Sequence, residues 1–232
     1  MNYRIGPAPR FHLPDDWPTR LAVNTGCEVA GDSIVAKADW RAPTADELAT
    51  LTAPGSVETA FSLLQLPTHL LERWTETASR LVEAGENFTY VGFVRALSEF
   101  LHFKGLPLPP GTTCDIVVTA PGLPTTRGGL HSSVDEAGGI LGLVNVGEEA
   151  TAIAVLPVSP TAMRERLAET VGGGRSLAAD FLKHFPDEPL VKIELKRGEG
   201  CWLPADGAVF DGWTVEQTQP GVLLMFRLGT PG

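Results

Sequence analysis

The chain has 232 residues, of which 43% are hydrophobic and 20% are charged, and its formal net charge at pH 7 is −10. A chain of this length can bury a full hydrophobic core without disulfides or bound metals. The net negative charge, with no basic cluster longer than Lys196-Arg197, disfavours nucleic acid and anionic membranes as partners, because their phosphate groups repel an acidic surface.

The cysteines and the hydropathy pattern indicate the compartment. Cys27, Cys114 and Cys201 lie far apart and have the spacing of neither a zinc site nor a disulfide framework. The N-terminal residues lack an apolar stretch of signal-peptide length, and no later segment is long enough to span a bilayer. These features predict a soluble, cytoplasmic protein with reduced thiols.

Residues 1–110 are predicted to form a mainly helical layer. They begin with a Pro-rich stretch that contains one short strand at 33–37. Apolar residues then recur at helical spacing, with start and stop signals at the ends of each run. Helices are expected at the capping box formed by Thr44 and Glu47, after Pro67 as far as Gly85, and from about 88 to 103.

After residue 111 the pattern changes to short apolar and β-branched runs separated by Gly and Pro, which is typical of strands. A helical insert at 159–185, with Ser159 as N-cap and Pro160 as first helical residue, interrupts these runs. Strands are expected at 114–119, 138–146, 151–158, 190–195, 199–203, 208–211 and 222–228. The order predicts a single α+β domain over 1–232, whose core at 111–232 is a jelly-roll or cupin-like barrel.

His131 and Asp135 are candidates for part of a metal site, just before the strand expected at 138–146. A neutral imidazole and a carboxylate beside open coordination positions make two thirds of the facial triad of non-haem iron oxygenases. The usual arrangement has one residue between these ligands, whereas three intervene here. An ordinary hydrogen-bonded loop gives the same pattern, so both interpretations stay open.

Arg227, at the end of the apolar run 222–226, is a candidate anchor for an anion. A guanidinium is costly to bury without an anionic partner, and its paired donors match a carboxylate such as that of 2-oxoglutarate. Thr214 is a candidate to add a hydroxyl to the same anchor. The alternative is an arginine whose head group reaches solvent or pairs with Asp or Glu.

Two blocks of sequence resemble the iron(II)/2-oxoglutarate-dependent oxygenases. Residues 198–214, which include Gly-Ala-Val-Phe-Asp-Gly-Trp-Thr, and the strand 222–227 are similar to the family's C-terminal block. In that block a His-Asp-Gly-x-Thr stretch carries the distal metal-binding histidine, and a later arginine grips the co-substrate. Residues 129–135 and 141–147 resemble the segment with the proximal His and Asp. The resemblance, over roughly 112–228, implies a double-stranded β-helix that uses Fe(II) and 2-oxoglutarate to oxidise a small metabolite.

Carried over residue by residue, the resemblance assigns roles to five side chains. If two inserted residues are allowed, His131 and Asp135 match the proximal metal ligands. Arg227, with Thr214, matches the anchor of the 2-oxoglutarate carboxylate, and Asn145 is a further candidate contact with the co-substrate.

Phe210 stands at the position of the distal histidine, and a phenyl ring cannot coordinate a metal. Asp211 would replace it only if the strand slipped by one residue, which would turn its side chain to the opposite face. The sequence therefore leaves two functions open. One is an oxygenase with an incomplete triad, and the other is a metal-free barrel of the same fold that binds a ligand or partner, or catalyses a non-oxidative step.

Overall fold

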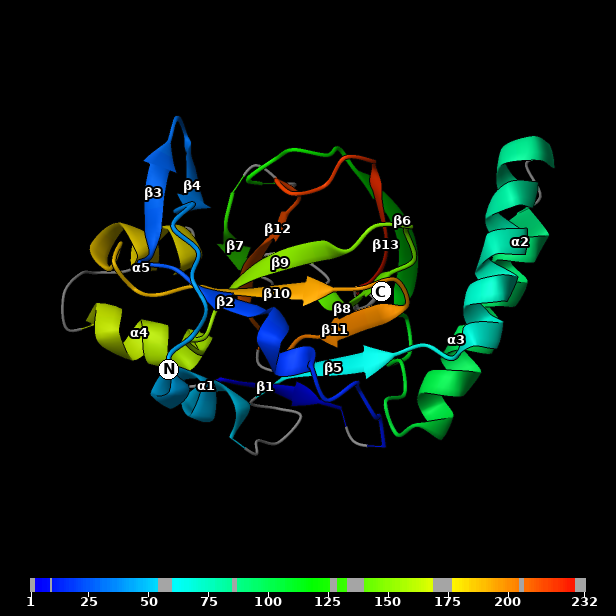
Figure 1. Cartoon of the computed structure of the whole chain (residues 1–232), viewed down its shortest axis with the longest axis horizontal. Helices are drawn as coiled ribbons and strands as arrows, with labels where there is room; N and C mark the ends of the chain where they lie inside the picture. The colour runs from blue at the N-terminus through cyan, green and yellow to red at the C-terminus, as the bar shows by residue number, and fades with distance from the viewer. Residues whose placement is uncertain are drawn as a thin grey trace.

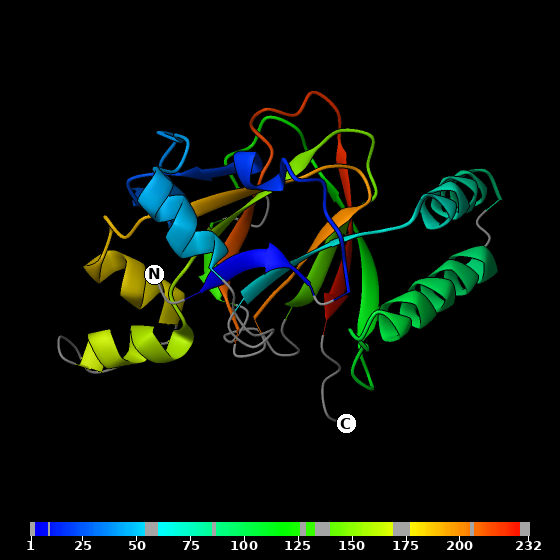
Figure 2. The ribbon, with the colours of Figure 1, turned by 60° about the horizontal axis from the view of Figure 1, so that its bottom comes forward.

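The computed structural model describes residues 3–8, 10–53, 60–84, 87–125, 129–132, 140–168, 177–204 and 207–227. Within these residues the protein is a mixed α+β fold in which two β-sheets face each other and most of the helices pack on their outer surfaces (Figures 1 and 2). None of the described helices is long and apolar enough to cross a membrane.

The larger sheet has six strands. Among the residues that the structure describes, β1 and β5 pair in parallel and the other pairs of this sheet are antiparallel. The strands follow the order β1 (Arg4–Pro7), β5 (Ala60–Gln65), β11 (Glu199–Trp202), β8 (Ile140–Asn145), β13 (Gly221–Arg227) and β6 (Thr113–Thr119).

The second sheet has five antiparallel strands, and a separate hairpin stands beside it. The five strands follow the order β2 (Leu21–Val23), β10 (Val191–Leu195), β9 (Thr151–Leu156), β12 (Val209–Trp213) and β7 (His131–Ser132). The hairpin consists of β3 (Cys27–Ala30) and β4 (Ser33–Ala36).

The α-helices begin where the sequence predicts, whereas the short 3₁₀ turn at Trp17–Arg20 was not predicted. The described helices are the 3₁₀ turn η1 (Trp17–Arg20), α1 (Ala45–Thr52), α2 (Thr68–Ala84), α3 (Asn87–Phe103), α4 (Pro160–Ala168) and α5 (Leu177–His184). The capping box of α1 is confirmed, because the Thr44 hydroxyl accepts from the Glu47 amide and the Glu47 carboxylate accepts from the Thr44 amide. Ser159 accepts from the amide of Ala162 at 3.2 Å, as expected of the N-cap of α4.

Three apolar clusters hold the layers together. Between the sheets lie alternate residues of both, among them Phe61, Ile153, Ile193, Phe210 and Met225. The outer face of the six-stranded sheet packs against α2 and α3 through Trp74, Phe93, Leu97, Trp202 and Phe226. The outer face of the five-stranded sheet packs against α4, α5 and the hairpin through Met163, Phe181, Leu156, Val209 and Trp213.

The N-terminal residues are less helical than predicted. The strand expected at 33–37 is β4, but β1 and β5 also extend the six-stranded sheet and β2 extends the other. The sequence of β5, Ala-Phe-Ser-Leu-Leu-Gln, shows no alternation because both of its faces are buried, which removes the signal that distinguishes a strand. The seven predicted C-terminal strands agree closely with β6 and β8 to β13, whereas the two-residue β7 was missed.

Candidate functional site

His131, the first of the two predicted metal ligands, begins strand β7, at the edge of the five-stranded sheet. His131 of β7 is paired in register with Phe210 of β12. On the other side of β12, Phe210 is paired with Val155 of β9. The residue at the expected position of the distal histidine is therefore the direct cross-strand neighbour of the candidate proximal histidine.

The Phe210 side chain belongs to the core between the two sheets. It is 1% exposed and shares this cluster with Cys201, Ala208 and Met225. The site at which the resemblance expects a metal ligand thus holds a buried aromatic ring with apolar residues around it. A group of this kind contributes to stability and offers no lone pair to a cation.

Asp211 faces away from this core, as strand alternation predicts. Its carboxylate is buried and accepts hydrogen bonds from the Thr125 hydroxyl, from the Gly129 amide at 3.1 Å and from the Gly212 amide at 2.6 Å. These contacts tie the segment before β7 to β12. The register slip that would turn Asp211 inward is not found, because Phe210 is the inward residue.

The metal prediction itself is not decided by these contacts. Asp135 and the His131 side chain lie outside the part of the chain that the structure describes. Among the residues that are described, no group of three or more His, Cys, Asp or Glu side chains could hold a metal ion. Metal binding through His131 and Asp135 therefore stays a prediction.

Arg227 ends β13 and pairs with an acidic residue on the neighbouring strand. Its Nε lies 3.4 Å from Oδ2 of Asp115 on β6, and both side chains are partly exposed. The β13–β8 register shifts between Phe226 and Arg227, so this residue sits at an irregular strand end. The alternative in which the arginine pairs with a carboxylate accounts for the observed geometry. Asp115 was not singled out from the sequence, although its place on a predicted strand was.

The Thr214 side chain is hydrogen-bonded to the backbone of the connection that follows β6. Its buried hydroxyl donates to the carbonyl of Ala120 at 2.8 Å and accepts from the amide of Leu123 at 3.1 Å. Ala120 follows the Thr119 end of β6, whereas Arg227 pairs with Thr113 at the other end of the same strand. Six residue steps of a strand span about 20 Å. The structure therefore does not bring Thr214 and Arg227 together on one carboxylate.

Asn145 ties two strands together at the same end as Thr214. Its amide donates to the carbonyls of Glu149 at 2.8 Å and Leu195 at 2.9 Å, and its oxygen accepts from the Gly147 amide at 2.9 Å. The side chain is fully buried. Donors and acceptor are all used, so the contacts describe a structural role at the end of β8.

The candidate residues are divided between the two ends of the sandwich. The chain passes from the Asn145 end of β8 into the start of β9, so Leu156 at the end of β9 lies at the opposite end. Leu156 pairs with Val209, and Val209 pairs with Ser132, so β7 lies at this opposite end. Ile140, at the start of β8, pairs with Arg227, so Arg227 lies at this end too. His131 and Arg227 thus share one end, while Asn145 and Thr214 share the other.

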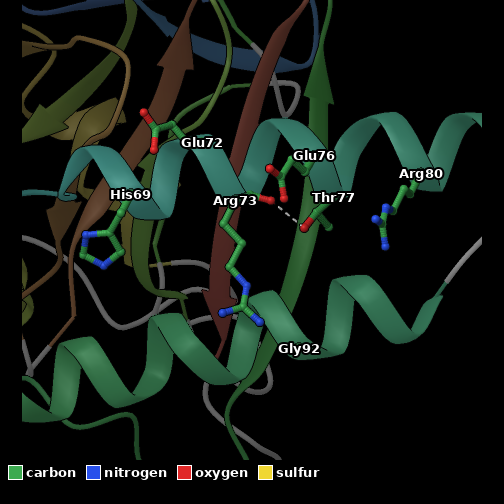
Figure 3. A pocket seen from close by; sticks show the side chains of 7 residues that line it. All are labelled: His69, Glu72, Arg73, Glu76, Thr77, Arg80 and Gly92. Atoms are coloured by element: carbon green, nitrogen blue, oxygen red, sulfur yellow. Dashed lines mark hydrogen bonds between the residues drawn. The ribbon is translucent and has the colours of Figure 1, made fainter.

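On the outer surface, described residues of α2 line two hollows, one shared with α3 and one with the six-stranded sheet. The first, of about 500 Å³, lies between α2 and α3 and is lined by His69, Glu72, Arg73, Glu76, Thr77, Arg80 and Gly92 (Figure 3). Its ionisable side chains are exposed and mix both charge signs along α2, and the Thr77 hydroxyl donates to the Arg73 carbonyl. This arrangement is typical of a solvated helix face and does not indicate a binding site.

The second hollow, of about 370 Å³, lies between α2 and the six-stranded sheet. Its walls are mainly apolar, with Trp74, Ala78 and Leu81 from α2 facing Ile116, Val118 and Val222 from β6 and β13. The groove was not predicted from the sequence, because its existence depends on the distance between α2 and the six-stranded sheet.

Comparison of the chain with protein-family models, with curated proteins and with solved structures found no match. The function must therefore be inferred from the fold and from the placement of these side chains.

Proposed function

We propose that β6 to β13 form a double-stranded β-helix, the barrel that the sequence resemblance implies. The strand order supports this proposal. The eight consecutive strands are shared between the sheets so that β6, β13, β8 and β11 are neighbours in one and β7, β12, β9 and β10 in the other. Two interleaved four-stranded sheets are the arrangement of a jelly roll. Strands β1, β5 and β2 then extend this core at its edges.

We further propose that this barrel works without a metal, as a protein that binds a ligand or a partner. The observation that carries the proposal is the placement of Phe210, which is 1% exposed between the sheets and directly beside His131. The residues present do not fit a complete iron triad, because the ring occupies the position of the third ligand. The free cysteines agree with a location in the reducing cytoplasm.

The second candidate is an iron(II)/2-oxoglutarate-dependent oxygenase that acts on a small metabolite and uses an unexpected third ligand. One observation favours it, namely that His131 and Arg227 lie at the same end of the barrel. In this alternative, His131 and Asp135 would hold the iron, and Arg227 would exchange Asp115 for the carboxylate of 2-oxoglutarate.

An anaerobic titration of the metal-stripped protein with iron(II) and 2-oxoglutarate separates the two candidates. The measured signal is the visible charge-transfer band of the chelated keto acid. We expect no band while circular dichroism reports a folded protein. A saturable band that is lost in both His131→Ala and Arg227→Ala would overturn the metal-free proposal and establish the oxygenase site.

The Phe210→His variant tests the origin of the scaffold, with Phe210→Leu as the matched control for the loss of the ring. If the barrel descends from an oxygenase, Phe210→His should give the charge-transfer band and Phe210→Leu should not. A folded Phe210→His variant that binds neither iron(II) nor 2-oxoglutarate would mean that the motifs are wrongly aligned.

A further inference from the structure

Strand β6 is an edge strand with little of the usual protection, because Asp115 is its one charged residue. In the described part of the chain it pairs only with β13, through seven residues in continuous register. Its sequence, Thr-Cys-Asp-Ile-Val-Val-Thr, contains neither Lys nor Pro, and no bulge interrupts its pairing with β13. Proteins ordinarily protect long, apolar edges by such devices, because an open edge accepts a further strand.

The backbone of β6 indicates which residues would pair. The Cys114 carbonyl accepts a hydrogen bond from the Tyr90 hydroxyl of α3 at 2.6 Å, so this group points away from β13. In an antiparallel ladder, alternate residues direct their backbone groups to the same side. Ile116 and Val118 therefore direct theirs toward the open edge, where no partner for them lies in the described residues.

The side chains of these two residues lie in the groove beneath α2. Ile116 is 39% exposed and Val118 is 66% exposed, although both sit opposite the apolar face of the helix. Figure 2 shows the α2–α3 hairpin projecting beside the sheet edge that β6 forms. The open backbone edge and the apolar groove are thus parts of one continuous surface.

The charge of this surface selects among possible occupants. Glu148 and Glu149 line the groove. Arg197 pairs with Glu148 at 2.7 Å, whereas Glu149 accepts hydrogen bonds from the neutral groups of Thr218 and Gln219, so Glu149 carries the negative charge that a partner would meet. Hydrogen bonds from the Thr218 hydroxyl and from the Thr218 and Gln219 amides hold the pKa of the Glu149 carboxyl below its ordinary value, so it stays negative at neutral pH. A cationic partner is favoured, and a second copy of this chain, which also carries a charge of −10, is disfavoured.

We propose that β6 and the groove bind an extended segment of a partner protein. The segment adds a strand beside Ile116 and Val118, places apolar side chains at alternate positions in the groove, and carries Lys or Arg toward Glu149. The inference rests on the proposed binding function, because it names the surface and the class of partner through which the barrel would act.

The test uses the full-length protein and a phage-displayed library of random twelve-residue peptides. We expect enriched peptides with apolar residues at alternate positions and with Lys or Arg. Binding of one synthesised peptide, measured by fluorescence anisotropy, should weaken at least tenfold in Val118→Lys. It should stay unchanged in Val29→Lys, an exposed strand position on the separate β3–β4 hairpin. N-methylation of single peptide amides should abolish binding at every second position, where the amide faces β6, and should have little effect at the positions between.

Three results would overturn the inference. The first is that the library yields no enriched peptides, and the second is that Val118→Lys leaves peptide binding unchanged. The third is that the wild-type protein is a dimer and Val118→Lys makes it a monomer, because the groove would then bind a second copy of the chain. The iron titration distinguishes this failure from failure of the proposed function. A charge-transfer band together with peptide binding rejects the metal-free barrel and keeps the surface, whereas no band and no peptide binding reject only the surface.

Discussion

Phe210 and His131 are direct cross-strand partners, which places a buried phenyl ring beside the backbone of the strongest sequence candidate for metal binding. In a double-stranded β-helix oxygenase this pair of neighbouring strands would carry metal ligands from both sides. Here the β12 residue of this pair contributes its ring to the core between the sheets, and the printed contact between the two strands is their backbone pairing.

The first prediction concerns the stability that this ring provides. Replacing Phe210 by Ala removes a ring that is 1% exposed and leaves a cavity, which should lower the free energy of unfolding by about 3–5 kcal/mol. Urea unfolding followed by circular dichroism measures the change. Phe103→Ala is the matched control, because this phenylalanine is 76% exposed and its loss should cost less than about 0.5 kcal/mol. Equal effects in the two variants would contradict the buried placement of Phe210.

The second prediction separates a structural role of Thr214 from a role in co-substrate binding. Thr214→Val keeps the volume but leaves the Leu123 amide without its hydroxyl acceptor, so the free energy of unfolding should fall by about 1–2 kcal/mol. Thr214→Ser keeps the hydroxyl and should cost less than about 1 kcal/mol. The same urea titrations decide the matter. If Thr214→Val is as stable as the wild type, the Thr214 hydroxyl is not needed for stability, and the co-substrate role that the resemblance implies would be favoured.

Sequence reasoning succeeded where the signal is local. The capping box of Thr44 and Glu47 is a contact across three residues, and the structure contains it as predicted. The C-terminal strands were found because Gly and Pro turns separate short apolar runs. By contrast, β5 is buried on both faces and β7 has two residues, so neither gives a periodic pattern.

The candidate site was harder to predict than the strands, because it depends on which end of a strand each residue occupies. Thr214 and Arg227 are close to one another in the sequence, yet they lie at opposite ends of the sandwich. The resemblance aligned Phe210 with the family's distal histidine, an alignment that stays a prediction, and strand alternation correctly predicted that Asp211 would face away from Phe210. The partner of Arg227, Asp115, comes from a strand more than a hundred residues earlier, which no local pattern records.

The third prediction follows from the capping box. The Arg41 guanidinium, followed by the Thr44 amide, lowers the pKa of the Glu47 carboxyl from 4.5 to about 2. A lowered carboxyl pKa contributes stability that is fully present above the unfolded value and is lost as pH falls through the folded value. Glu47→Gln should therefore cost about 1 kcal/mol at pH 7, and this difference should shrink between pH 4.5 and about 2. Thermal unfolding of both proteins across this pH range measures it, and a difference that persists at the acid end would contradict the assignment.

The fourth prediction concerns a buried ion pair that joins the N-terminal segment to the six-stranded sheet. Arg20 and Glu199 form a salt bridge with side chains only 8% and 5% exposed, and Glu199 also accepts from the Lys196 amide at 2.9 Å. Arg20→Met leaves a buried charge and should cost about 3 kcal/mol or more. The double variant Arg20→Met/Glu199→Gln should be more stable than Arg20→Met, because the remaining group is neutral and still accepts from Lys196. A double variant less stable than Arg20→Met would show that the uncompensated charge is not the dominant cost.

The fifth prediction asks whether any cysteine is available for chemistry. Burial raises the pKa of the Cys114 thiol to about 11, and it also raises the pKa of Cys201 and Cys27 above the ordinary value of 9.0. Because only the thiolate is nucleophilic, all three should react slowly with iodoacetamide at pH 8 in the folded protein and rapidly in urea. Mass spectrometry of tryptic peptides measures the labelling, and a Val29→Cys variant provides an exposed thiol as positive control. Rapid labelling of native Cys114 would place a thiolate on β6, within the surface proposed for the partner segment.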